Sequence, residues 1–433
     1  MSEKWTVKGQ IVVDHELPEL AEAFGPRNGL AGIIVKVSAR SKVLGGWGWW
    51  NGWGQQVTDR DGRFQVSESH GGDRRQFKVE ILLDSDRMRM KRGQETSIRL
   101  DHDGFPLDIE LDLTDKDWFE VHDDQNGAAT DGRKAGSIDL RAIAVRASVA
   151  RSLADAWFLY GKVLDLFESF GSGHAFQKKV TVKYPMNIGS GAAGSHSYSN
   201  PVNGCVYIKE GELYSRTLIH ELMHQWAYQH STGEDNMAWQ LAKHGDTHQT
   251  RENTTFVPFH EAFAEWSSYK ILKGITDGKL LNFKEDFVYK YPDLPLTRAH
   301  VSAALGASER TLANVDYTER GWHSLFNVLT IPYLDRCDFN RPLTDSDDEY
   351  VFYNIFTSDT CPENRLAYTL EDVLGVFLQY PAKGIDSYMR KDDLDFFHFL
   401  ARAGAVLPGL EAEKIKLVKT CLNPNSTANP CPA

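Results

Sequence analysis

The stretch LIHELMHQWAYQH, residues 218–230, decides how this sequence is interpreted. It places His220 and His224 four residues apart, so that on a helix both imidazoles lie on one face, one turn from each other. Such a pair can bind one Zn²⁺ ion. Glu221 can reach a water on that ion without being a ligand itself. This HExxH spacing predicts a metal site with a general base beside it.

Two imidazoles leave a zinc ion under-coordinated, so a third protein ligand is needed. One candidate is His230, because HExxHxxGxxH is the pattern of the metzincin peptidases. Ala227, however, stands where that pattern has its glycine, and alanine continues a helix instead of ending it. On a continuous helix, at ~100° per residue, His230 lies about 240° around from His224 and well away from the metal.

The second candidate lies in FVPFHEAFAEWSSY, residues 256–269, where Glu261 and Glu265 are four residues apart on another predicted helix. One of these carboxylates can bind the metal. The other, one turn along, can orient a ligating histidine without touching the metal. The residues alone leave this candidate and His230 both open.

HELMHQW followed by HEAFAEW closely resembles the catalytic core of the M1 aminopeptidase-type gluzincins, whose motifs read HELxHxW and NEGFAEY. The matching residues are His220, Glu221, His224, Trp226, Glu261, Phe263, Ala264 and Glu265. The resemblance implies one Zn²⁺ per chain, with His220, His224 and Glu261 as ligands. It also implies that Glu265 contacts a ligating histidine. The activity it implies is peptide-bond hydrolysis, with a zinc-bound water as nucleophile and Glu221 as general base.

Two departures from the M1 pattern concern specificity. The gap between the second histidine and the third ligand, residues 225–260, is longer than in typical M1 enzymes. No GxMEN-like segment precedes the active-site helix, and in M1 enzymes that segment binds the substrate's free amine. SNPVNGCVYIKE, residues 199–210, takes its place, and its strand CVYIKE is expected to pair as an edge strand with an extended peptide. We therefore expect an endopeptidase, with an M1-type aminopeptidase as the alternative. A non-catalytic binding protein with a relic metal site is a second alternative.

Gluzincins also place a tyrosine or histidine where charge develops on the attacked carbonyl. VDYTERGWHSLF, residues 315–326, resembles the M1 segment YEKGF. We expect Tyr317 to stabilise the oxyanion, with His323 as a fallback donor. Tyr317 stands one residue further from its glycine than in that segment, so a core or surface tyrosine is the alternative.

The organisation of the chain predicts a multidomain α+β protein. Residues 1–115 contain β-prone runs separated by turn residues, among them 97–100 and 106–113, which predicts an antiparallel β-sandwich. The run over 29–66 resembles the transthyretin-like sandwich. Residues 116–136 are polar and are expected to be a linker. Residues 137–433 form the expected peptidase domain. It opens with one or two helices over 137–170, and the gluzincin resemblance implies a thermolysin-like, mostly helical fold.

GGWGWWNGWG, residues 45–54, concentrates four tryptophans among glycines. They are Trp47, Trp49, Trp50 and Trp53. Exposed aromatic side chains on a loop often mark recognition of a protein, glycan or membrane surface. We expect these residues to bind substrate or a protein or glycan partner. The alternative is that the loop packs against the catalytic domain and the rings are buried.

The charge and composition of the chain limit the classes of partner that we expect. The formal net charge is −12, which argues against a nucleic-acid backbone or an anionic membrane as the main partner. No apolar run approaches the ~18 residues of a membrane span, and a peptide or protein substrate is expected. The start, MSEKWTVKGQ, shows no secretory signal. A cytoplasmic location is the default expectation, with non-Sec export or a removed leader as alternatives. Two disulfides or four thiols are expected among Cys337, Cys361, Cys421 and Cys431.

Overall fold

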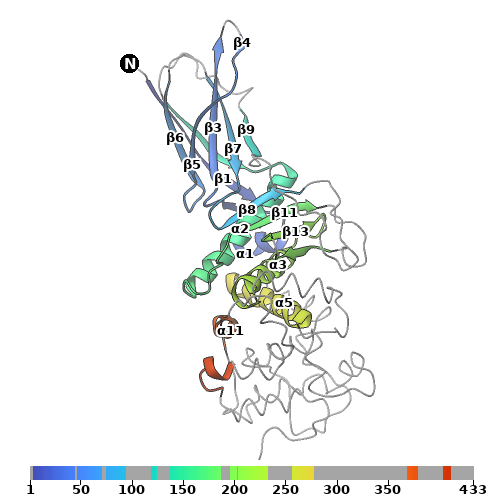
Figure 1. The fold of residues 1–433 in the computed structure, drawn as a ribbon. Coiled ribbons are helices and arrows are strands. Elements are labelled where there is room, and N and C mark those ends of the chain that lie inside the picture. Colours follow the sequence, from blue (N-terminus) through green and yellow to red (C-terminus); the bar gives the residue numbers. More distant parts are fainter. Residues whose placement is uncertain are drawn as a thin grey trace, which may run out of the picture.

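The computed structural model shows how the two quoted motifs are brought together (Figure 1). It describes residues 3–43, 46–70, 75–93, 119–123, 136–186, 196–201, 203–232, 256–276, 368–378 and 403–410. These residues form both sheets and helices, so the predicted mixed α+β character is confirmed. The strands expected at 97–100 and 106–113 lie outside the described residues.

The chain order of the elements is needed to follow the topology. The strands are β1 (Glu3–Asp14), β2 (Arg27–Gly29), β3 (Ile34–Val43), β4 (Gly46–Trp47), β5 (Asn51–Val57), β6 (Arg63–His70), β7 (Arg75–Leu82), β8 (Met88–Arg92), β9 (Phe119–Asp123), β10 (Gly136–Ala144), β11 (Val180–Met186), β12 (Tyr198–Asn200) and β13 (Cys205–Lys209). The helices are α1 (Pro18–Phe24), α2 (Ser148–Ser169), α3 (Ser215–Ala227), α5 (Phe256–Ile275) and α11 (Leu370–Phe377), and a π-helix, η1 (Tyr228–Thr232), continues α3.

Two sheets make up the N-terminal end of the molecule (Figure 1). In the first, β1 lies between β10 and β2 and also pairs with β6; the second has the order β4-β3-β7-β9, with β5 also paired to β3. Along β1, Trp5, Val7 and Ile11 are buried, at the period of two that a half-buried strand requires. The ring of Trp5 meets that of Phe77 on β7, with 6.4 Å between centroids. The apolar faces of the two sheets therefore pack on each other.

Strand β10 corrects the expectation of a helix from residue 137. Residues 136–144 pair in parallel with β1, and α2 begins only at Ser148. The apolar residues Ile138, Leu140 and Ile143 fit a helical period as well as a strand. Backbone pairing with β1, which is distant in sequence, makes this segment a strand. Strand β9 lies inside the stretch expected to be a linker. The N-terminal sheets thus include residues beyond 115, and one of their pairings is parallel, where an antiparallel sandwich was predicted.

A third sheet, with the order β12-β13-β11-β8, lies beside α3. Strands β8, β11 and β13 are parallel, and β12 runs antiparallel to β13. Strand β13 pairs on both sides, so the expectation that CVYIKE is an edge strand is wrong. The reason is that Tyr198–Asn200 turns back onto β13 and occupies that edge. Among the described strands, β12 is the edge next to α3.

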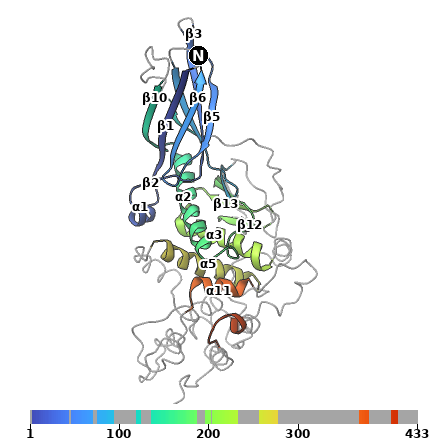
Figure 2. The same ribbon diagram turned by 90° about the vertical axis from the view of Figure 1, so that its left-hand side faces the viewer.

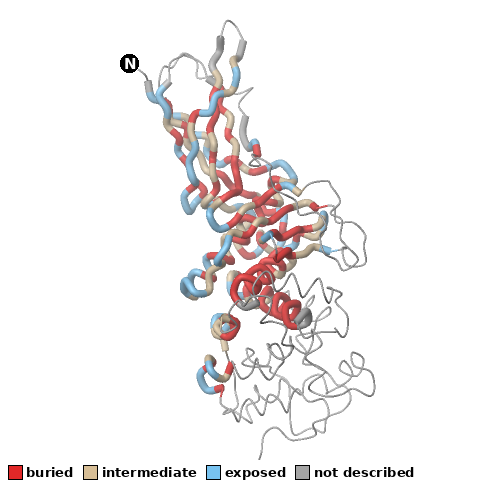
Figure 3. Tube along the Cα trace, viewed as in Figure 1, coloured by how far each residue is buried: buried red, intermediate tan, exposed pale blue. Residues whose placement is uncertain are grey.

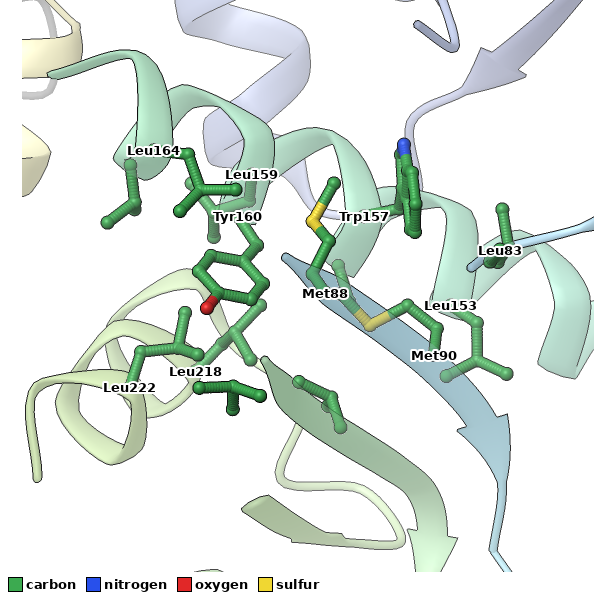
Figure 4. Packing of buried hydrophobic residues seen from close by; sticks show 14 of the residues in the cluster. Leu83, Met88, Met90, Leu153, Trp157, Leu159, Tyr160, Leu164, Leu218 and Leu222 are labelled. Atoms are coloured by element: carbon green, nitrogen blue, oxygen red, sulfur yellow. The ribbon is translucent and has the colours of Figure 1, made fainter. Parts of the chain in front are cut away.

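Helix α2 joins the N-terminal sheets to the helices below. Trp157 and Tyr160 of α2 belong to one buried cluster with Met88 and Met90 of β8 and Leu218 of α3 (Figure 4). Figure 3 shows that α3 and α5 are buried along most of their length. Within the described part of the chain, no helix combines the length and the apolar character that a membrane crossing requires.

A buried polar network fixes the end of β1 on α2. The carboxylate of Asp155 accepts hydrogen bonds from His15 Nδ1 at 2.6 Å and from the backbone N–H groups of Glu16 and Leu17 at 2.7 and 3.2 Å. The Asn28 amide donates to His15 Nε2 at 2.9 Å. Buried polar groups need such partners, and this network satisfies both ring nitrogens of His15 and both backbone N–H groups at a junction between segments far apart in sequence.

Candidate metal centre

Two neighbouring helices carry the predicted site. Helix α3 holds His220, Glu221 and His224, and α5 holds Glu261 and Glu265. Figures 1 and 2 both place these helices next to each other, with α11 beyond α5. The motif HELMHQW therefore faces the motif HEAFAEW across one helix–helix contact.

His220, His224 and Glu261 converge at this contact. The two Nε2 atoms of the histidines are 3.0 Å apart. Nε2 of His220 lies 3.3 Å from Glu261 Oε2, and Nε2 of His224 lies 3.3 Å from Glu261 Oε1. Among the residues that the structure describes, these three form a group able to hold a metal ion. The fold thus brings together the three residues that the sequence predicted as ligands.

The spacing of these atoms fits a zinc ion. Ligand atoms that surround zinc tetrahedrally at about 2.0–2.1 Å are about 3.3–3.4 Å from one another. The separations here are 3.0, 3.3 and 3.3 Å. Two imidazole nitrogens and one carboxylate are donors that zinc uses in catalytic sites, where a fourth position is left to water or substrate. The donor set and its spacing therefore both fit Zn²⁺.

The charges around the site also favour a cation. The carboxylates of Glu221, Glu261 and Glu265 are all buried, as is the imidazole of His224. Burying several carboxylates in one place is costly unless positive charge compensates them. Glu221 is not a member of the ligand group, although it follows His220 directly.

Glu265 lies one turn after Glu261 and connects the cluster to a cation. Its Oε2 atom is 3.5 Å from Nδ1 of His220, the ring nitrogen that does not face the cluster. Its Oε1 atom contacts the guanidinium of Arg216. The contact of Glu265 with a ligand histidine was predicted from the sequence, whereas the contact with Arg216 was not. The available signal was the spacing of Arg216, four residues before His220 on the same helical face.

His230, the rival third ligand, lies elsewhere. Because η1 continues α3, its ring is carried away from the cluster, where Nε2 donates to the carbonyl of Ala175 at 2.9 Å. Nδ1 accepts a hydrogen bond from the Gln177 side chain at 3.1 Å. Burial lowers the pKa of His230, although the Ala175 carbonyl opposes this effect. Both ring nitrogens of His230 are therefore engaged in hydrogen bonds to the segment that precedes β11.

Motif residues outside the ligand group hold α3 in place. Trp226 packs on Phe263 of α5, with 5.8 Å between ring centroids. The amide of Gln225 donates to Ser199 Oγ at 2.8 Å, and that hydroxyl donates to the backbone carbonyl of Glu221 at 3.0 Å. These bonds tie α3 to the edge strand β12.

Two further rings border the cluster and were not predicted. Tyr228 stacks on His224, with centroids 5.8 Å apart and planes 18° apart, and its ring lies 5.9 Å from that of His260. Burial, together with a smaller effect of His224, lowers the pKa of His260 to about 3, and Glu261 opposes this shift. His260 is therefore neutral at physiological pH. The sequence offered a signal for His260, because HEAFAEW has a histidine where the M1 motif NEGFAEY has asparagine.

The four tryptophans do not share one environment. Trp53 is buried against Phe77, with 5.1 Å between ring centroids. The ring of Trp50 lies under the guanidinium of Arg40, 4.4 Å from its centroid. Trp49 is 91% exposed. Trp47 belongs to β4, at the end of the N-terminal sheets away from α3 (Figure 1). Trp53 thus belongs to the core, and Trp49 does not pack against the metal centre.

Several predicted residues fall outside the described part of the chain. These are Tyr317, His323, Cys337, Cys361, Cys421 and Cys431. Their predicted roles therefore stay predictions.

Comparisons with known proteins add little. No protein-family model matches the chain. No curated protein matches it. Among solved structures, part of the chain matches a 9R-lipoxygenase from Cyanothece PCC8801 with a TM-score of 0.18 and 14% identity. That match covers 33% of this chain and 16% of the lipoxygenase, and a likeness at this level carries no argument.

Proposed function

We propose that this protein is a zinc-dependent peptidase of the gluzincin type. One observation carries the proposal: His220, His224 and Glu261, taken from two motifs far apart in sequence, present their ligand atoms 3.0–3.3 Å from one another. The similarity of HELMHQW and HEAFAEW to the M1-type motifs independently suggests the same three ligands and the same chemistry.

The proposal also assigns the architecture. The two N-terminal sheets correspond to the transthyretin-like β-sandwich. The tip of these sheets is the connection between β4 and β5, which carries Trp49. The sheet β12-β13-β11-β8, together with α3 and α5, corresponds to the core of a thermolysin-like peptidase. Both assignments rest on the sequence resemblances and on the order of the elements.

The residues of the chain divide the work of hydrolysis. A bound Zn²⁺ would supply a Lewis acid that polarises the scissile carbonyl and lowers the pKa of a water. Glu221 accepts a proton from the attacking water and later donates it to the leaving amine. Glu265 holds the Nδ1 proton of His220, so that Nε2 keeps its lone pair toward the cluster. Tyr317 remains the predicted donor to the oxyanion.

Strand β12 is the proposed binding surface for the substrate backbone. It is the edge of its sheet among the described strands, and Ser199 ties it to the backbone of Glu221. An extended peptide can add to such an edge through main-chain hydrogen bonds. This replaces the earlier expectation for β13 and would place the peptide alongside α3.

Endopeptidase activity is preferred over M1-type aminopeptidase activity because no GxMEN-like segment precedes α3. A non-catalytic binding protein with a relic metal site is the other alternative. Glu221, which holds the general-base position of the HExxH pattern directly after His220, argues against it.

Metal removal and readdition test the proposal. Protein treated with a chelator should lose cleavage of blocked fluorogenic peptides and regain it with about one equivalent of Zn²⁺ per chain. Zinc uptake without cleavage of any peptide in a diverse library would favour the binding protein. Absence of zinc uptake would reject the metal centre itself.

A further inference from the structure

We propose that Arg216 is a positioning residue of the metal centre, acting through Glu265 on the ring of His220. The inference rests on the proposed metal centre, but it does not depend on which reaction the centre catalyses. No role for Arg216 follows from the HExxH pattern or from the ExxxE pattern.

The geometry forms a continuous path from Arg216 to a ligand. Arg216 and His220 are four residues apart on α3, so their side chains leave the helix on one face. The carboxylate of Glu265, which comes from α5, divides its two oxygens between them. Oε1 contacts the guanidinium, and Oε2 lies 3.5 Å from Nδ1 of His220. The side chains of Arg216 and Glu265 are 21% and 8% exposed, so this is an interior pair and not a solvated surface salt bridge.

The position of Arg216 in its helix points the same way. The N-terminal end of a helix carries partial positive charge and favours acidic residues. The first turn of α3 has no acidic residue, and Arg216 adds a cation there. Helix stability therefore does not explain this arginine, whereas its contact with a buried carboxylate does.

The charges of the centre balance when Arg216 is counted. Among the described residues, Glu221, Glu261 and Glu265 place three carboxylates in a buried site, and these carry three negative charges when all are ionised. A divalent cation would offset two of them, and the guanidinium offsets the third. The planar fork of arginine also restrains the carboxylate that it binds more strongly than a single ammonium does. Glu265 is thus held where it can accept the Nδ1 proton of His220.

Zinc affinity of the full-length protein tests this inference, measured by competition with a chromophoric chelator. Arg216→Met should weaken zinc binding about 10–100-fold, the usual cost of losing an outer-shell partner. Arg216→Lys keeps the charge without the fork and should recover part of the loss. The control variant is Arg151→Met. Arg151 lies on α2, outside the metal cluster; it is also partly buried and donates to the backbone carbonyl of His15 at 3.2 Å. The zinc affinity of this variant should match that of the wild type.

A double-variant comparison separates this role from general destabilisation. If Arg216 acts through Glu265, then Arg216→Met should add little to the zinc loss already caused by Glu265→Gln. The electronic spectrum of the Co²⁺-loaded protein should change in the same direction in both single variants. Additive losses of affinity, or wild-type zinc affinity in Arg216→Met, would overturn the inference. Should Arg216→Met fail to fold, Arg216→Lys tests the same claim, and wild-type affinity in that variant overturns it.

The outcomes also separate this inference from the proposed function. Wild-type protein that binds zinc but cleaves no peptide refutes the peptidase and leaves the role of Arg216 intact. Wild-type protein that cleaves peptides, together with undiminished zinc affinity in Arg216→Met, refutes the role of Arg216 alone.

Discussion

Nε2 of His224 lies 3.3 Å from Oε1 of Glu261, although residues 225–260 separate the two in sequence. The pairing of His220 with His224 is local, because the pitch of one helix sets it. The position of Glu261 beside these histidines depends instead on the packing of α5 against α3. Trp226 and Phe263 form part of that packing, and each belongs to one of the two motifs. The same short segments therefore supply the ligands and the contact that brings them together.

Glu221→Gln should retain zinc and the fold but lose turnover by about 10²-fold or more, because it removes the base and not a ligand. Zinc content after dialysis and the rate of peptide cleavage check this directly. A variant that kept most of its activity would show that another group accepts the proton.

Glu261→Ala should lose zinc or bind it far more weakly, whereas His230→Ala should keep it. The ring of His230 is engaged with Ala175 and Gln177 and does not join the ligand group. Both residues are buried, so each variant serves as the other's control for general destabilisation. Zinc loss in the His230 variant alone would restore the metzincin interpretation.

Blocked peptides should be cut at internal bonds, and amino-acid p-nitroanilides should be poor substrates. The expectation follows from the missing amine-binding segment before α3. Product analysis by mass spectrometry shows which bonds are cut. Rapid release of p-nitroaniline with no cleavage of blocked peptides would favour the M1-type aminopeptidase.

Trp49 and Trp53 should behave differently when truncated. Trp49→Ala should change stability by no more than about 0.5 kcal/mol, because the side chain is 91% exposed. Trp53→Ala should cost about 3–5 kcal/mol, because its ring fills the core against Phe77. Urea unfolding measures both. Cleavage of a short peptide by Trp49→Ala should equal that of the wild type, and binding of a macromolecular partner should weaken if the tip recognises one.

Acid should destabilise the metal-free protein through His230. Burial lowers the pKa of this imidazole below its ordinary value of 6.5. Between the lowered value and about 6.5 the unfolded chain binds more protons than the folded protein, so stability falls as the pH drops through this window. One such group contributes at most about 1.4 kcal/mol per pH unit. His230→Gln should therefore show a shallower slope of unfolding free energy against pH, measured with a chelator present. An unchanged slope would contradict the shift.

The candidate site was largely predictable from sequence because its residues lie at helical spacings. His220, His224, Glu261 and Glu265 were all named from their i, i+4 pattern and their motif context. Arg216 and Tyr228 were missed because their contacts depend on which residues α5 and the continuation of α3 bring beside them. The distance of His230 from the ligand group was predicted because Ala227, unlike glycine, lets the helix continue, and the chain does continue past it as the π-helix η1.

The sheets were less predictable, because strand partners are not local. Ile138, Leu140 and Ile143 fit either period, and only pairing with β1 makes residues 136–144 a strand. Tyr198–Asn200 is too short and too polar to stand out as a strand, yet it takes the edge that was expected for Cys205–Lys209. In both cases the deciding hydrogen bonds come from a segment that the local pattern does not reveal.

The placement of β8 and β10 has a consequence for how such a protein can evolve. Strand β8 precedes β10 in the chain, yet β8 belongs to the sheet beside the metal centre and β10 to the sheet at the N-terminal end. A gene segment cut anywhere between them therefore encodes two pieces that each lack a strand made by the other. Duplication or recombination of either piece alone would therefore leave one sheet without one of its strands.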